Sequence, residues 1–118
     1  MKLSEIQRIL DAEVLVGHEW LDEIDAQKAC GADLMSDVLA SVQHNSLLLT
    51  GLCSLQVIRT AEMIEVSTIV FVRGKRPETD VIKMGNELNM VIMTTPLTLY
   101  HACGKLYESG LRPSMKEN

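Results

Sequence analysis

The sequence predicts an α/β fold: a three-layer sandwich with a mainly parallel sheet, built on a βαβαβ unit at residues 46–98. Three short apolar segments, at residues 46–51, 68–74 and 90–96, have the length of buried strands, and the first two end in glycine. Two amphipathic stretches with helical spacing separate these segments. Continuous apolar strands that alternate with helices are typical of a parallel sheet covered on both faces. We therefore expect the rest of the chain to extend this unit.

Helices are predicted within and after the central unit by apolar residues at helical spacing. They cover residues 54–65, 78–88 and 97–109. Pro77 and Pro96 suit the first turns of the second and third of these helices, because their fixed φ and missing N–H are tolerated there. Gly110 is the expected stop of the last helix.

The segment before the central unit predicts a helix at residues 3–10, a strand at 13–17, a weaker strand at 26–30 and a helix at 34–42. Ser4 is the expected cap of the first helix and Asp33 that of the second, since both side chains can accept a hydrogen bond from a first-turn amide. Asp37 would then lie in a first turn, where negative charge suits the helix dipole.

The composition fits one domain with an aliphatic core. Hydrophobic residues make up 47% of the 118 residues but aromatic residues only 3%, so valine, isoleucine, leucine and methionine must fill the interior. We expect this domain to cover residues 1–111 and a flexible polar tail to cover residues 112–118.

Charge and hydropathy exclude two classes of partner. The net charge of −5 argues against nucleic-acid binding, which requires a clustered basic surface. No apolar run reaches the roughly 18 residues of a membrane span, so no membrane association is expected. The chain start lacks the apolar segment of a signal peptide, and three cysteines without tight spacing fit a reducing compartment. We therefore predict a cytoplasmic protein.

A candidate binding site follows from the predicted topology. The carboxyl ends of parallel strands lie along one edge of the sheet, where ligands bind near helix N-termini. This edge would carry hydroxyls, backbone amides and three positive charges, a combination that suits an anion such as a phosphate group. The predicted ligand-binding residues are Thr50, Gly51, Arg73, Gly74, Lys75, Arg76, Thr95 and Thr98. A second interpretation stays open, because turn chemistry and a solvated basic loop also explain these residues.

Two common nucleotide motifs are missing from the sequence. The segment Gly74-Lys75-Arg76 lacks the first glycine and the Ser or Thr of a phosphate-binding loop, and no Gly-x-Gly-x-x-Gly run occurs. We therefore infer neither a nucleotide-hydrolysing nor a dinucleotide-dependent enzyme, and we expect no catalytic residue and no cofactor.

The cysteines support thiol or metal chemistry only weakly. Cys30, Cys53 and Cys103 show no Cys-x-x-Cys spacing, and the three histidines show no His-x-x-x-His spacing, so no metal site is predicted. Cys53 lies at a helix start, where a thiol pKa could be lowered. The favoured interpretation is that all three are small buried hydrophobic residues.

The segments 47–51, 69–74 followed by Pro77, and 94–102 together resemble the DRTGG domain family. The resemblance runs from about Leu3 to Leu111, and residues 30–40 are similar to those of small stand-alone members, which are related to the amino-terminal non-kinase part of HPr kinase. The chain departs from the name-giving signature: no Asp-Arg pair lies near residues 50–53, and the Thr-Gly-Gly part survives only as Val72-Arg73-Gly74.

The resemblance implies an accessory role. Members of the family accompany catalytic domains such as phosphate acetyltransferase, or paired ligand-sensing domains in regulated pyrophosphatases, as regulatory and dimerising modules. We therefore expect a non-catalytic regulatory domain that forms a homodimer, acts on a partner enzyme and binds a small anionic ligand, either a nucleotide or a phosphometabolite. One alternative is a small thiol- or metal-dependent redox-linked protein that uses Cys30 or Cys53. Another is a scaffold for oligomerisation alone.

Overall fold

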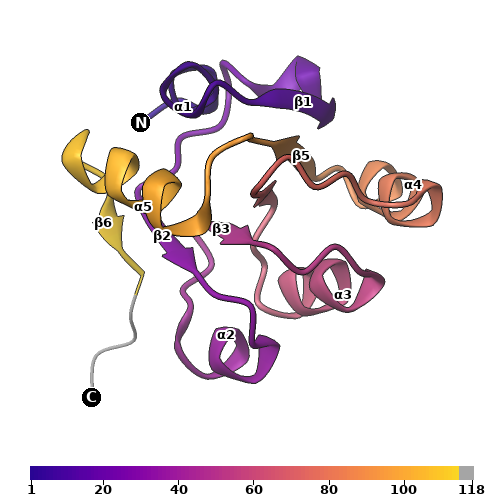
Figure 1. The fold of residues 1–118 in the computed structure, drawn as a ribbon. Helices are drawn as coiled ribbons and strands as arrows, with labels where there is room; N and C mark the ends of the chain where they lie inside the picture. The colour runs from indigo at the N-terminus through magenta and orange to yellow at the C-terminus, as the bar shows by residue number, and fades with distance from the viewer. Residues whose placement is uncertain (115–118) are drawn as a thin grey trace.

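Six strands form one sheet in the order β1-β5-β4-β3-β2-β6 in the computed structural model, which describes residues 1–114 (Figure 1). Only β1 is antiparallel to its neighbour β5; all other neighbours are parallel. The strands are β1 (Glu13–Val16), β2 (Lys28–Gly31), β3 (Ser46–Thr50), β4 (Thr68–Phe71), β5 (Val91–Thr94) and β6 (Arg112–Pro113). The predicted mainly parallel sheet is confirmed.

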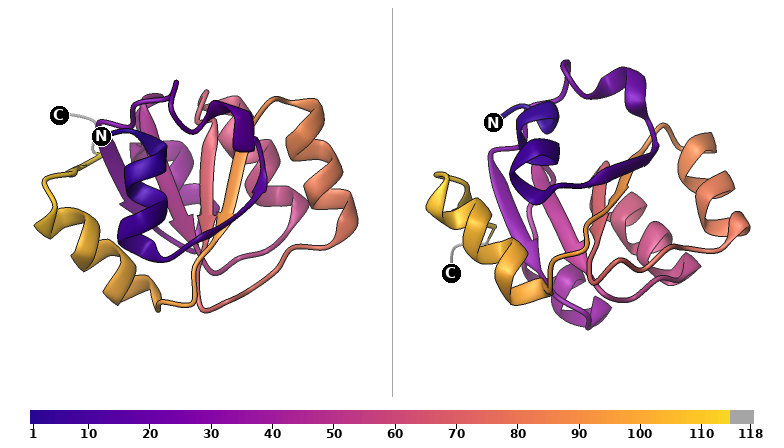
Figure 2. Two further views of the ribbon diagram at one scale, coloured as in Figure 1. Left: turned by 90° about the horizontal axis from the view of Figure 1, so that it is seen from above. Right: turned by 45° about the horizontal axis from the view of Figure 1, so that its top comes forward.

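Helices cover both faces of the sheet, and this gives the predicted three-layer sandwich (Figures 1 and 2). One face carries α1 (Leu3–Leu10) and α5 (Leu99–Glu108). The other carries α2 (Met35–Ser41), α3 (Leu55–Met63) and α4 (Thr79–Glu87). A short 3₁₀ helix, η1 (His18–Trp20), follows β1.

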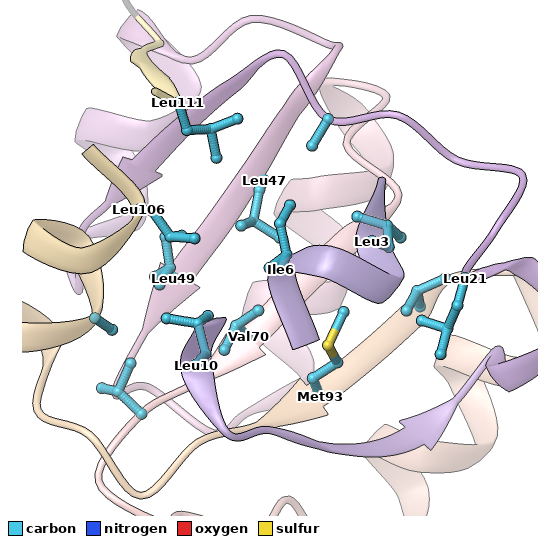
Figure 3. Packing of buried hydrophobic residues seen from close by; sticks show 14 residues of the cluster. Leu3, Ile6, Leu10, Leu21, Leu47, Leu49, Val70, Met93, Leu106 and Leu111 are labelled. Atoms are coloured by element: carbon cyan, nitrogen blue, oxygen red, sulfur yellow. The ribbon is translucent and has the colours of Figure 1, made fainter. Parts of the chain in front are cut away.

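The central strands are buried on both sides, which explains their continuous apolar sequences. In β3, Leu47 and Leu49 pack toward α1 and α5, while Leu48 packs toward the other three helices. Figure 3 shows the first of these two layers, where Leu47, Leu49, Val70 and Met93 of the sheet meet Leu3, Ile6, Leu10 and Leu106 of the two helices. Two hydrophobic cores, one on each side of the sheet, therefore stabilise the fold.

Two predicted helix caps are wrong. Lys2 occupies the N-cap position of α1 and Leu34 that of α2, and neither makes a side-chain cap. The isolated pairing of Lys2 with Asp25 fixes the chain at the start of α1, so α1 begins one residue before Ser4. Asp33 uses its carboxylate elsewhere, as described below. The predicted stop at Gly110 is confirmed: its φ is 109°, and the amide of Leu111 returns to the carbonyl of Leu106 at 3.0 Å.

The first residues of the predicted tail form the short edge strand β6. Arg112 and Pro113 pair with Lys28 and Ala29 of β2, and the amide of Ser114 donates to the carbonyl of Ala29 at 2.9 Å. The buried hydroxyl of Ser114 also bonds to that of Ser46. The sequence lacks a strand pattern here because only two residues pair; the remaining part of the predicted tail, residues 115–118, lies outside the described residues. Among the helices of residues 1–114, none has the length and apolar character needed to span a membrane.

Candidate functional site

The topology reverses between β4 and β5. The chain leaves β4 toward α4 on one face and leaves β5 toward α5 on the other. A parallel sheet commonly binds its ligand in the crevice that such divergent loops leave at the carboxyl edge. The residues predicted from the sequence at this crevice are Arg73 to Arg76 in one loop and Thr95 to Thr98 in the other.

Hydrogen bonds between the two loops close this crevice. The amide of Arg73 donates to the carbonyl of Leu97, and that of Gly74 to the carbonyl of Thr95, both at 2.7 Å. The hydroxyl of Thr94 donates to the carbonyl of Lys75 at 2.7 Å. Backbone groups that would otherwise face a ligand are therefore already paired.

The predicted threonines of the second loop serve the fold. The hydroxyl of Thr95 is fully buried and donates to the carbonyl of Leu10 at 2.5 Å, which ties the end of α1 to the end of β5. The hydroxyl of Thr98 accepts from the amide of His101 at 3.2 Å and so caps α5. The side-chain hydroxyls of Thr95 and Thr98 therefore already have partners within the fold.

Arg76, in the same loop as Arg73 and Lys75, pairs with Glu13 at the start of β1. Two parallel hydrogen bonds of 3.0 and 2.8 Å join the guanidinium to the carboxylate. The hydrogen bond and the positive charge of Arg76 lower the pKa of Glu13 below its ordinary value. The cation of Arg76 is compensated within the chain.

Asp33 organises the remaining part of the edge. Its Oδ1 accepts from the hydroxyl of Thr50 at 3.0 Å and from the amide of Gly51 at 2.7 Å. The same hydroxyl accepts from the amide of Leu52 at 3.1 Å. This carboxylate was missed as a site residue by sequence reasoning, which assigned it to a helix cap. Asp33 comes just after a predicted strand and so lies on the same edge of the sheet as Thr50 and Gly51. That position in the sequence could have identified it as a site residue.

Two cations approach the loop after β3. A Cβ built on Gly51 would lie 3.2 Å from a guanidinium nitrogen of Arg73 and 3.5 Å from Oδ1 of Asp33, so the bare glycine lets both groups come close. The charge of Lys75 lowers the pKa of the Cys53 thiol, against a larger increase from burial, which places Lys75 near the same loop. Within residues 1–114, neither Arg73 nor Lys75 forms a salt bridge.

The N-terminus of α3 adjoins these cations. Ser54 occupies its N-cap position, yet the side chain makes no cap bond. The Ser54 hydroxyl oxygen is buried and has no hydrogen-bond partner among the described residues. First-turn amides of a helix lack intrahelical acceptors and carry partial positive charge. The edge therefore gathers a helix N-terminus, two cations and one carboxylate. We name this group, made of Asp33, Thr50, Gly51, Ser54, Arg73 and Lys75, the Asp33–Lys75 edge.

The three cysteines are free thiols, and each is partly buried. Burial raises the pKa of Cys30, Cys53 and Cys103, so the expected lowering at Cys53 is wrong. Cys30 packs on the side of α2 and α3, and Cys103 packs on the side of α1 and α5 against Gly31 of the same strand as Cys30. The charge of Cys103 adds to the effect of burial in raising the pKa of Cys30. Within residues 1–114, no three His, Cys, Asp or Glu side chains gather closely enough to hold a metal ion.

The fold and this edge define a small three-layer α/β domain. The family model described as the DRTGG domain matches residues 5–109, and the chain belongs to this family. No curated protein matches the sequence, so the family assignment rests on this family model alone.

A solved structure is similar over the whole fold. It is that of the CBS and DRTGG domains of the regulatory region of Clostridium perfringens pyrophosphatase, complexed with an activator, diadenosine tetraphosphate. The TM-score is 0.73 at 18% sequence identity, and the match covers 99% of this chain and 51% of that chain. This chain thus spans about half the length of the solved one, and the likeness at this identity concerns the fold.

Proposed function

We propose that this chain is a non-catalytic regulatory domain of the cytoplasm, which forms a homodimer, binds a small anionic ligand and acts on a partner enzyme. Family membership supports the regulatory role. The similar solved structure supports the ligand class, since that protein is the regulatory region of an enzyme and carries a nucleotide activator. The proposed ligand is a nucleotide or a phosphorylated metabolite.

The observation that carries the ligand proposal is the presence of two basic side chains, Arg73 and Lys75, beside the loop that leads into α3. Arg76 of the same loop forms a salt bridge with Glu13, whereas Arg73 and Lys75 form no salt bridge within residues 1–114. Backbone amides of a helix start and basic side chains together bind phosphate groups.

The carboxylate of Asp33 favours a nucleotide over a bare phosphate. Its Oδ1 already accepts two hydrogen bonds, whereas Oδ2 has no partner among the described residues. A carboxylate repels phosphate but accepts hydrogen bonds from hydroxyl or amino groups. A ribonucleotide carries both a phosphate group and hydroxyl or amino donors. Its phosphate can bind Arg73 and Lys75 while a donor group binds the carboxylate of Asp33.

The proposal is tested by calorimetric titration of the purified protein with AMP, ADP, ATP, diadenosine tetraphosphate, acetyl phosphate and inorganic phosphate. We expect at least one nucleotide to bind, with the affinity falling as salt rises. Arg73→Gln should weaken binding by about ten- to a hundredfold, because a hydrogen bond to a charged group contributes roughly 1.5–3 kcal/mol.

Arg76→Gln is the matched control, since it removes a cation from the same loop that already has a partner. Binding should stay within about twofold of the unmodified protein in this variant. The absence of heat and of a thermal shift with every compound would refute the ligand proposal. Equal losses in Arg73→Gln and Arg76→Gln would instead show that the Asp33–Lys75 edge is not the site.

A further inference from the structure

The outward face of α5 carries an unusual concentration of aromatic surface. The chain has two tyrosines, and both lie on this helix. Tyr100 is 91% exposed and Tyr107 is 56% exposed. Two helical turns separate them, so they lie on one side of α5. Together with His101, Gly104 and Glu108 they line a hollow of about 680 Å³.

No contact within the domain requires a glycine at position 104, which lies between the two tyrosines. A glycine within a helix costs about 0.5–1 kcal/mol relative to alanine. A Cβ built on Gly104 would have no other atom within 4 Å, whereas one built on Gly85 of α4 would clash with the side chain of Ile92. Packing inside the domain therefore explains Gly85 but not Gly104. A missing side chain on an exposed helix face lets another backbone approach closely.

We propose that α5 packs antiparallel against α5 of a second copy of this chain, with the two-fold axis passing at Gly104. This inference rests on the proposed function, which includes a homodimer, and it specifies the surface through which the two copies meet. In such a pair, residues at equal distances on either side of Gly104 face each other. Tyr100 then meets Glu108 of the second copy, and His101 meets Tyr107 of the second copy.

These pairs are chemically complementary, which favours a second copy over an unrelated partner. The phenol hydroxyl of Tyr100 donates to the carboxylate of Glu108, and the imidazole of His101 packs beside the ring of Tyr107. An isologous interface forms each pair twice. Arg112 lies over the ring of Tyr107, 4.5 Å from its centroid, and donates to the Tyr107 carbonyl at 3.2 Å, so this ring is already held in place.

The interface extends beyond the helix. A ten-residue helix is only about 15 Å long, whereas stable interfaces bury about 800 Å² per partner. A second hollow of about 140 Å³ adjoins the first, shares Cys103 and Tyr107 with it, and continues over Gly31 and Pro113 at the edge of the sheet. The contact area therefore includes the open end of β2 beside β6, and we expect a concentration-dependent dimer.

Sedimentation equilibrium over a concentration series tests the interface with the full chain. We expect the unmodified protein to be a dimer and Gly104→Arg to be a monomer with an unchanged circular dichroism spectrum, since the space around position 104 is open. Met63→Arg is the control: Met63 is 71% exposed on α3, on the opposite face of the sheet, so this variant should remain a dimer.

The pairing itself is tested by charge exchange. Tyr100→Glu should weaken the dimer at least about tenfold, because it faces Glu108 of the second copy with a like charge. Adding Glu108→Lys to Tyr100→Glu should restore the dimer, and no recovery would overturn the proposed register. A Gly104→Arg variant that stays dimeric would overturn this interface but leave the homodimer intact. A monomeric unmodified protein would overturn both.

Discussion

Asp33, which follows β2, accepts a 2.7 Å hydrogen bond from the backbone amide of Gly51, which follows β3. The same carboxylate oxygen accepts from the hydroxyl of Thr50, whose side chain is fully buried. One acidic side chain thus satisfies two polar groups of the neighbouring loop. This bond fixes the loop that leads into α3, and with it the position of the helix N-terminus at the Asp33–Lys75 edge.

Replacement of Asp33 should destabilise the fold. Asp33→Ala leaves the Thr50 hydroxyl and the Gly51 amide without this acceptor, and unsatisfied buried groups cost about 1–3 kcal/mol. We expect the free energy of unfolding, measured by urea denaturation, to fall by about that amount, and by less in Asp33→Asn, which keeps one acceptor oxygen. Asp22→Ala, at an exposed loop position, should change it by less than about 0.5 kcal/mol. Equal effects of Asp33→Ala and Asp22→Ala would contradict this account.

Arg73 should show a conflict between stability and binding. Its φ of 57° is in the left-handed region, which costs a non-glycine residue about 1–2 kcal/mol. Arg73→Gly removes that strain but also makes the unfolded chain more flexible, so we expect the free energy of unfolding to rise by up to about 1 kcal/mol. Nucleotide affinity should fall in the same variant. A loss of stability on this substitution, measured in urea, would show that the guanidinium supports the fold rather than a ligand.

Lys75 should control the acidity of Cys53. Burial raises the pKa of this thiol and the charge of Lys75 partly offsets the increase, so Lys75→Met should raise the pKa further. The rate of alkylation at Cys53, followed by mass spectrometry across a pH series, should move to higher pH in the variant. Cys103 serves as the internal reference because its raised pKa has burial as its only cause. Fast alkylation of one cysteine at neutral pH would instead support the thiol-dependent alternative.

The Arg76–Glu13 pair should contribute to stability in a pH-dependent way. The pKa of Glu13 is lower in the folded chain than in the unfolded chain. Its contribution is therefore present above the unfolded pKa and is lost as the pH falls through the folded pKa. We expect Arg76→Gln to be slightly less stable at neutral pH and equal to the unmodified protein in acid, as measured by urea unfolding at several pH values. A difference that persists in acid would mean that Arg76 acts through packing.

Local sequence patterns were sufficient for most elements. The apolar segment of β3 and the β-branched segment of β4 are buried on both faces, so no alternation is needed to recognise them as strands. The helix at Leu3–Leu10 was predicted with its observed bounds because its apolar residues lie on one side. Caps were predicted poorly, since a side chain such as Asp33 has several possible partners and the sequence does not rank them.

Local patterns in the sequence were enough to predict an α/β fold with its glycine- and threonine-rich turns at one edge of a mainly parallel sheet, because hydrophobic periodicity and turn residues act over short distances. Which of those turns come together depends on the tertiary structure. It paired Arg76 with Glu13, buried the hydroxyl of Thr95 against α1, and brought Asp33 beside Gly51. These contacts join residues that are distant in the chain, and their choice depends on how the helices pack across the two faces of the sheet.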